Sequence, residues 1–196
     1  MALVAVLLAA MAGGALVVRA PVARDGPPPI GPSAVGLEEA VRRTLAAGSA
    51  RVHASLVAGG ERVDLSGVVS LTGPGAEVTG TMPGAGPVDV RATADGTWLR
   101  TGGPEGAWAA VPPAAARLAA EARSWADLLA GLRPEPGAGR SAAAAGGRLR
   151  ARSSGHPAQV EIDGAGRIRR LVVDRGRTTL DVRLADHGLP VHVQPP

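Results

Sequence analysis

Apolar residues recur at every second position over much of this chain, and this period of two constrains its fold more than any other feature. Val52, Ala54 and Leu56 alternate with polar neighbours, and the same pattern recurs in 61–71, 76–82, 88–94, 148–152, 158–163, 167–174 and 178–184. Strict alternation is typical of strands with one face buried. Gly-rich turns such as 58–60, 73–75 and 164–166 join neighbouring segments, which predicts an antiparallel sheet with one apolar face.

Two helical regions interrupt the alternation. Leu37, Val41 and Leu45 recur every four residues and predict a helix over 37–47, which Gly48 ends. After Pro112 the helical spacing returns in Leu118, Ala122, Trp125, Leu129 and Leu132, which predicts two short helices meeting near Ser124. The predicted order is a helix, about six strands, helices and about five strands, the last of them at 191–193. A sheet of about ten strands must curl or split.

The first eighteen residues carry no charged side chain and resemble a signal anchor or signal peptide. We expect an N-terminal membrane segment at 1–18, a Pro/Gly-rich tether at 19–36 and one domain at 37–196. Arg19 and Arg24 follow the apolar run, which would favour a cytoplasmic body by the positive-inside rule. Three topologies therefore stay open: an anchored extracytoplasmic domain, a cleaved and secreted domain, and a cytoplasmic body. We favour the extracytoplasmic face of the cell membrane.

Composition excludes several function classes. The chain has no Cys, so it lacks the thiol that a lipid anchor at the N-terminus would need. All basic residues are Arg and the net charge is only +4, while aromatic residues make up 2%. A stacking platform for bases would be hard to build from so few aromatic rings, and we expect no nucleic-acid partner.

No constellation for catalysis or metal binding stands out. Asp186, His187 and His192 fit no standard zinc spacing, and Ser153, Ser154 and His156 lie in a turn without a nucleophile elbow. The Gly-rich turns lie between strands, whereas a phosphate loop lies between a strand and a helix. We therefore expect no catalytic residue, no metal and no cofactor, and a protein that is not an enzyme.

Several strings resemble one family. Residues 45–52 resemble its helix end running into the first strand, and 95–100, Asp-Gly-Thr-Trp-Leu-Arg, resemble its aromatic strand. Residues 157–171 resemble its Gly-Arg-Leu-Arg-Arg hairpin, and 186–191, Asp-His-Gly-Leu-Pro-Val, its ending. The chain thus resembles the actinobacterial lipid-carrier lipoproteins of the LppX/LprG type, relatives of the LolA lipoprotein carrier. The resemblance covers roughly residues 36–194, but the lipobox Cys is missing.

The resemblance implies an α+β fold: a strongly curved antiparallel half-barrel sheet wrapped over a few short helices, with an apolar cavity between. It also implies a carrier that holds acyl chains of lipids or lipoproteins at the cell envelope. A filled core is the alternative, in which the domain serves envelope interaction or sensing. The candidate cavity residues are Val63, Leu65, Val69, Val78, Val90, Trp98, Trp108, Leu118, Trp125 and Leu129.

Arginines alternate along two of the predicted strands. Arg148, Arg150 and Arg152 share one strand face, and Arg167 and Arg169 share another. If the two strands are neighbours, these side chains form a basic stripe. Such a stripe is either a solvated outer face or a contact with anionic lipid headgroups and the membrane surface.

Overall fold

The structure is a computed structural model and describes residues 35–111, 125–136, 142–143 and 147–196. The predicted membrane segment at 1–18, all but the last two residues of the predicted tether, and Leu118 lie outside the described residues. The boundaries of the three predicted regions stay predictions. Within the described part of the chain, no helix combines the length and apolarity that crossing a bilayer requires.

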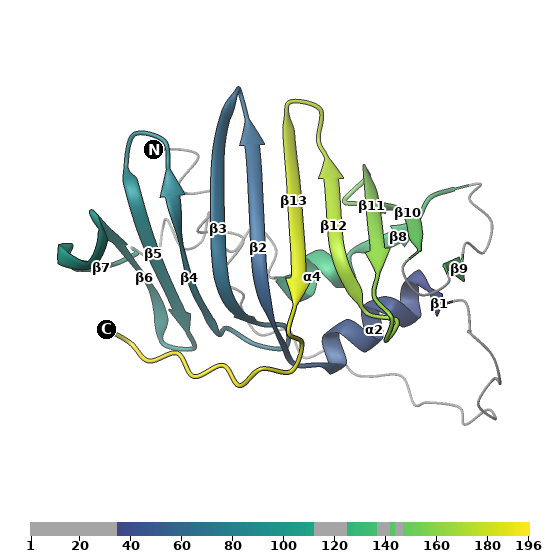
Figure 1. Cartoon of the computed structure of the whole chain (residues 1–196), viewed down its shortest axis with the longest axis horizontal. Coiled ribbons are helices and arrows are strands. Elements are labelled where there is room, and N and C mark those ends of the chain that lie inside the picture. Colours follow the sequence, from purple (N-terminus) through teal and green to yellow (C-terminus); the bar gives the residue numbers. More distant parts are fainter. Residues whose placement is uncertain (1–34, 112–124, 137–141, 144–146) are drawn as a thin grey trace.

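An eleven-stranded antiparallel sheet forms the body of the protein (Figure 1). Its spatial order is β7-β6-β5-β4-β3-β2-β13-β12-β11-β10-β8, and β7 and β8 form two open edges. Nearly all neighbours in this order are also neighbours in sequence, because hairpin turns join them. The strands are β2 (Ser49–Ala58), β3 (Glu61–Ser70), β4 (Ala76–Met82), β5 (Gly86–Thr93), β6 (Gly96–Thr101), β7 (Trp108–Ala110), β8 (Leu132–Pro134), β10 (Arg148–Ser153), β11 (His156–Ile162), β12 (Ile168–Asp174) and β13 (Thr178–Ala185).

The remaining elements are short. Strand β1 (Val35–Gly36) pairs with β9 (Ala142–Ala143), so the last two residues of the predicted tether are part of a small second sheet. Helix α2 (Leu37–Ala46) matches the predicted helix, and α4 (Trp125–Ala130) falls in the second helical region. A 3-10 turn, η1 (Gly103–Glu105), connects β6 to β7.

Helix α2 shows why its sequence is helical. Leu37, Ala40 and Thr44 are buried on one side, at the spacing of three and four residues that a helix brings together. On the exposed side Glu39 forms ion pairs with Arg42 at 2.5 Å and with Arg43 at 2.6 Å. Acidic residues in the first turn and a basic residue in the last also suit the helix dipole.

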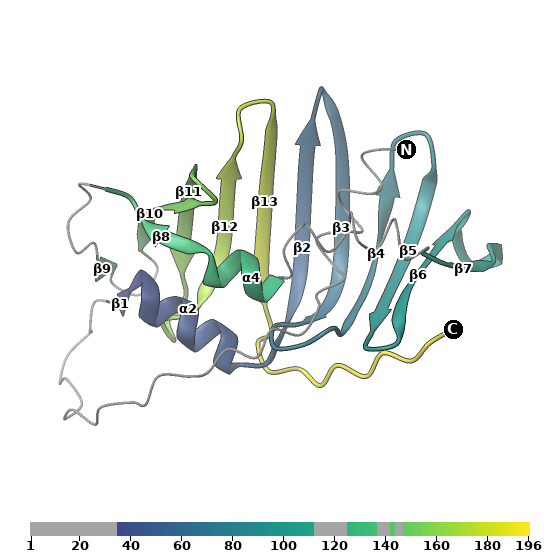
Figure 2. The ribbon, with the colours of Figure 1, turned by 180° about the vertical axis from the view of Figure 1, so that it is seen from behind.

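The two faces of the sheet differ in chemistry. We call the face toward α2 and α4 the inner face, and the opposite one the outer face. The inner face carries the buried core, with Val63, Val78, Val88, Val160 and Leu171 all at most 1% exposed. Both helices lie over the β11–β13 side of the sheet, and β3–β6 extends beyond them (Figure 2).

Glycines on the inner face bring β3 and β4 close together. Gly67 lies opposite Val78, and Gly80 lies opposite Leu65. A methyl group on Gly67 would overlap the carbonyl oxygen of Glu77, and one on Gly80 would overlap that of Asp64. Such glycines allow a sheet to bend sharply, which is how an open sheet acquires strong curvature.

The predicted fold class is confirmed. The structure has a large, open, curved antiparallel sheet with few helices, and one apolar and one polar face. One predicted element is wrong: residues 191–193 form no strand. The C-terminal segment is extended but crosses beneath the strand ends instead of pairing beside them (Figure 1).

Candidate functional site

Five predicted ligand residues lie together on the inner face. Val63, Leu65 and Val69 come from β3, Val78 from β4 and Val90 from β5, and each is at most 4% exposed. Cross-strand register joins them into rows, since Gly67 pairs with Val78 and Val78 with Val90. The rows consist mainly of Val, Ala and Gly, so the buried layer on this part of the sheet is built from small apolar side chains.

Two more predicted residues face the sheet from α4. Trp125 is 6% exposed and Leu129 is 2% exposed, and both belong to the same buried cluster as the inner-face valines. Leu128 lies beside them, so three apolar side chains of this six-residue helix point toward the sheet. The inner face and α4 thus form the apolar layer that the sequence predicts.

Trp98 and Trp108 are not in this layer, which corrects their predicted placement. Strand register puts Trp98 opposite Arg91 and Trp108 opposite Arg100, on the outer face. The guanidinium carbons of Arg91 and Arg100 each lie 4.8 Å from the Trp108 ring centroid. Trp108 therefore contacts two cations, a favourable arrangement for an indole face.

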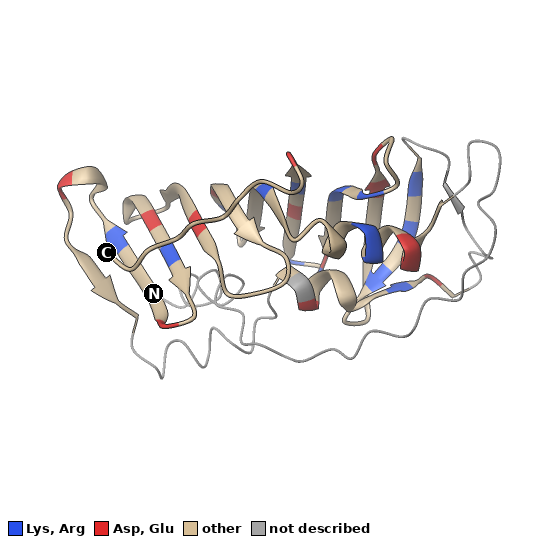
Figure 3. Cartoon of the chain, turned by 90° about the horizontal axis from the view of Figure 1, so that it is seen from below, with Lys and Arg blue, Asp and Glu red and all other residues tan. Residues whose placement is uncertain are grey.

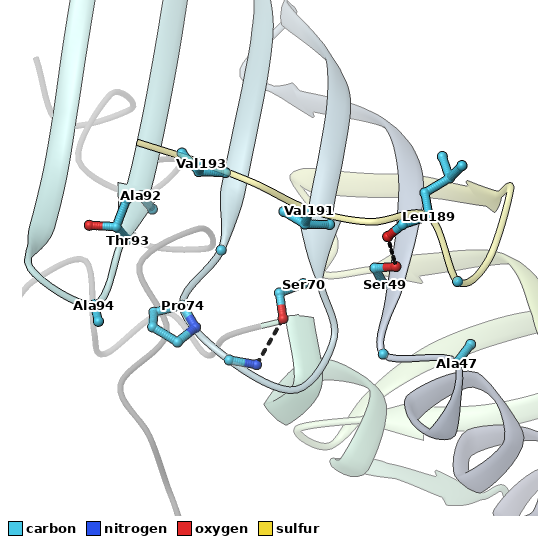
Figure 4. Close-up of a pocket in the computed structure, with 14 residues that line it drawn as sticks. Ala47, Ser49, Ser70, Pro74, Ala92, Thr93, Ala94, Leu189, Val191 and Val193 are labelled. Carbon is cyan, nitrogen blue, oxygen red and sulfur yellow. Dashed lines mark hydrogen bonds between the residues drawn. The ribbon is translucent and has the colours of Figure 1, made fainter. Parts of the chain in front are cut away.

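A groove of about 520 Å³ runs along the lower strand ends, and no sequence pattern had indicated it. We call it the strand-end groove (Figure 4). Most of its wall is backbone or small side chains, and Ala92 also belongs to the buried core. The lining residues are Ala47, Gly48, Ser49, Ser70, Gly73, Pro74, Gly75, Ala92, Thr93, Ala94, Gly188, Leu189, Val191 and Val193.

The C-terminal segment forms one wall of the strand-end groove. Leu189, Val191 and Val193 are half-buried, while the intervening residues are exposed. The segment is tied to β2 by Ser49, whose hydroxyl donates to the Leu189 carbonyl oxygen and whose carbonyl accepts from the Gly188 N–H at 3.0 Å. The predicted alternation at 191–193 is therefore real, but its apolar side faces the groove.

His187 begins this segment and is partly buried. Burial lowers the pKa of His187 below its ordinary value, and the nearby Arg167 guanidinium lowers it further, whereas Asp163 and Asp186 raise it. Its Nε2 atom is buried without a hydrogen-bond partner. The described residues contain no group of three or more His, Asp or Glu that could hold a metal ion.

The predicted arginine stripe is not continuous. Strand β11 lies between β10 and β12, so Arg148 and Arg169 are not on neighbouring strands. Glu161 lies between them and pairs with Arg148 at 3.0 Å and Arg169 at 3.2 Å. Acidic and basic residues also share the strands elsewhere on the sheet (Figure 3).

Two of the predicted headgroup arginines have no acidic partner among the described residues. Arg152 donates to the Gly155 carbonyl oxygen at 3.1 Å, and Arg150 lines a shallow hollow of about 260 Å³ together with Glu135 and Asp174. Arg167, which the sequence places with Arg169, instead pairs with Asp163 at 3.0 Å across the turn. The outer face therefore carries mixed charge.

Comparison with solved structures decides the fold relationship. The Mycobacterium tuberculosis lipoprotein LppX matches 81% of this chain and 98% of its own, with a TM-score of 0.53 and 17% sequence identity. This chain has the LppX fold. LprF from Mycobacterium bovis matches 82% of this chain and 94% of its own, with a TM-score of 0.48 and 16% identity.

The likeness to LppX extends over nearly the whole of that lipoprotein, so the match includes the full sheet rather than a shared hairpin. No family model matches the sequence, and no curated protein matches it either. The resemblance to the LppX/LprG type that the sequence strings indicate is thus confirmed by the three-dimensional arrangement, at a sequence identity of 17%.

Proposed function

We propose that this protein is a lipid-binding carrier of the cell envelope, which holds acyl chains against the inner face of β3–β5. The observation that carries this proposal is the continuous layer of small apolar residues on the inner face of a large, open, curved sheet. Val63, Val69 and Val78 define the centre of the proposed surface.

The free energy of burying an acyl chain is large enough for binding. Each methylene transferred from water to an apolar site contributes roughly 0.8 kcal/mol, so a chain of several methylenes binds without any specific polar partner. A site built from Val, Leu, Ala and Gly is chemically sufficient. No catalytic step is needed, and we propose a carrier that is not an enzyme.

The LppX fold supports the location. LppX is a mycobacterial lipoprotein by name, and it shares the sheet described above. We propose that this domain also works on the extracytoplasmic face of the membrane, attached through the apolar segment at 1–18. Arg150 and Arg152 are exposed and have no acidic partner in the part of the chain that the structure describes, so they are candidates for contact with lipid headgroups. Arg148 is a weaker candidate because Glu161 neutralises it.

The test is native mass spectrometry of the full chain produced in a lipid-rich actinobacterial host. A bound mass that denaturation releases as a lipid is the expected result. Val90→Phe should weaken lipid binding about tenfold, the equivalent of losing contact with about two methylenes. Val68→Phe is the matched control, because Val68 pairs with Arg51 and Glu77 on the outer face and should leave binding unchanged.

A chain that purifies without lipid and takes up none from added vesicles would overturn the carrier proposal. The filled-core alternative, an envelope interaction or sensing domain with the same fold, would then be favoured. Equal effects of the two phenylalanine substitutions on lipid affinity would instead place the ligand away from the inner face.

A further inference from the structure

Buried side-chain polar atoms without a hydrogen-bond partner are rare in folded proteins, and each one calls for an explanation. In the described part of the chain there are three: Trp125 Nε1, Ser153 Oγ and His187 Nε2. The His187 atom belongs to the C-terminal segment. The other two belong to the apolar layer between α4 and the inner face.

Trp125 is the first residue of α4. It lies three and four residues before Leu128 and Leu129, so all three side chains leave the helix on the same side, and all are buried in the core cluster. Its ring is 6% exposed, and its indole N–H meets no acceptor. An indole nitrogen can only donate, so whatever satisfies it must present an acceptor.

Ser153 provides a second, independent polar group on the same layer. It is the last residue of β10 and is 0% exposed. It lies on the inner face, where it pairs with Leu132 of β8. Leu132 follows the end of α4 by two residues, so the two unpartnered groups lie near the two ends of this helix. Tryptophan and serine could have been replaced by apolar residues here at no cost in hydrogen bonding.

We infer that the Trp125 indole N–H donates a hydrogen bond to an ester carbonyl oxygen of the bound lipid, with Ser153 as a second polar contact. This inference rests on the proposed carrier function and adds to it a specificity-determining residue, which distinguishes an ester-linked chain from an ether-linked one. The surroundings favour a neutral acceptor, because Leu128 and Leu129 on the same side of α4 are apolar and an anionic group buried beside them would lack a countercharge.

The experiment compares two lipids that differ only in the acceptor. One is a glycerol diester with two palmitoyl chains, and the other is the diether analogue with two hexadecyl chains, which has no carbonyl. The native chain should bind the diester about fivefold to tenfold more tightly, since one buried donor gains its partner. Trp125→Phe keeps an aromatic ring but removes the N–H donor, so this variant should bind the diester and the diether with about equal affinity.

Trp98→Phe is the matched control, because Trp98 lies on the outer face and should keep the native preference. A second measurement needs no substitution at Trp125. The chain has three tryptophans, so its indole N–H signals in a two-dimensional NMR spectrum can be assigned from Trp98→Phe and Trp108→Phe. The diester should move the Trp125 signal downfield, and the diether should not.

The outcomes separate this inference from the function on which it rests. If neither lipid binds the native chain, the carrier proposal fails. If both bind equally tightly, or if Trp125→Phe keeps the native preference for the diester, the carrier stands and the role of Trp125 is overturned. An indole signal that moves equally with both lipids has the same consequence.

Discussion

The hydroxyl of Thr44 joins helix α2 to strand β12 at the first residue of that strand, Ile168. Its Oγ1 accepts a hydrogen bond from the Ile168 N–H at 2.8 Å and donates one to the Ala40 carbonyl oxygen at 2.7 Å. Thr44 and Ile168 are both 0% exposed. This buried side chain thus helps to position the helix over the sheet.

Replacing Thr44 with valine should lower the free energy of unfolding by about 1–3 kcal/mol. Valine has nearly the same shape, but it leaves the buried Ile168 N–H without a partner, and that desolvation is uncompensated. Urea denaturation measures the change. Thr81→Val is the control, since Thr81 is exposed on the outer face of β4 and should change stability by less than about 0.5 kcal/mol. Equal effects of the two substitutions would show that the bond to Ile168 contributes nothing.

Local sequence signals predicted the elements that depend on local contacts. The hairpin between β2 and β3 follows from Gly59 and Gly60, which both have positive φ, and α2 follows from its apolar spacing. The inner-face positions of Val63, Leu65 and Val78 also follow, because alternation assigns a whole strand to one face. Hairpins place most strands beside their sequence neighbours, whereas local turns do not predict the pairing of β2 with β13 or of β10 with β8.

Features that depend on distant neighbours were not predictable. Trp98 has Thr97 and Leu99 as neighbours, so polar and apolar residues do not alternate clearly along the short strand β6. Only the pairing of β6 with β5 shows which of its residues lie on the inner face and which on the outer face. The Trp108 contacts need arginines from two different strands. Likewise, the alternation of apolar and polar residues in 189–193 cannot show whether the segment pairs with a neighbouring strand or lies along a groove.

Gly67→Ala should destabilise the chain by about 2–3 kcal/mol, as expected for overpacking against atoms that cannot move aside. The new methyl group would overlap the Glu77 carbonyl oxygen and lie 2.6 Å from Val78 Cα, both of them backbone atoms of β4. Thermal or urea unfolding measures the loss. Gly164→Ala is the matched control, because a Cβ there meets nothing within 4 Å. An alanine at Gly67 that is tolerated as well as the one at Gly164 would refute a close approach of β3 and β4.

Trp108→Leu should cost roughly 1–2 kcal/mol of stability while lipid affinity stays unchanged. The substitution removes the ring that Arg91 and Arg100 contact, and partly desolvated cation–π contacts have about this value. Urea denaturation and the lipid titration are run on the same preparation. A large loss of lipid affinity with normal stability would instead return Trp108 to the ligand site.

The chain should lose stability as the pH falls from about 7.5 to 5, and His187 should be the cause. Burial and the Arg167 guanidinium lower the pKa of His187, so the unfolded chain binds a proton on this side chain more readily than the folded chain does. The contribution of neutral His187 is therefore complete above the ordinary histidine pKa of about 6.5 and declines below it. Carboxylates whose pKa is lowered, such as Asp163 and Asp181, titrate well below this window.

His187→Gln removes the titrating group, so its free energy of unfolding should change little between pH 7.5 and 5. His192→Gln serves as the control, because His192 lies on the exposed side of the same segment and its removal should leave the native pH dependence intact. Urea denaturation at several pH values measures both variants. Protonation of His187 would also weaken the attachment of residues 188–193 over the strand-end groove, because it places a charge on a partly buried ring near the Arg167 guanidinium. An unchanged pH dependence in His187→Gln would assign the loss of stability to another group and leave the segment without a pH-sensitive anchor.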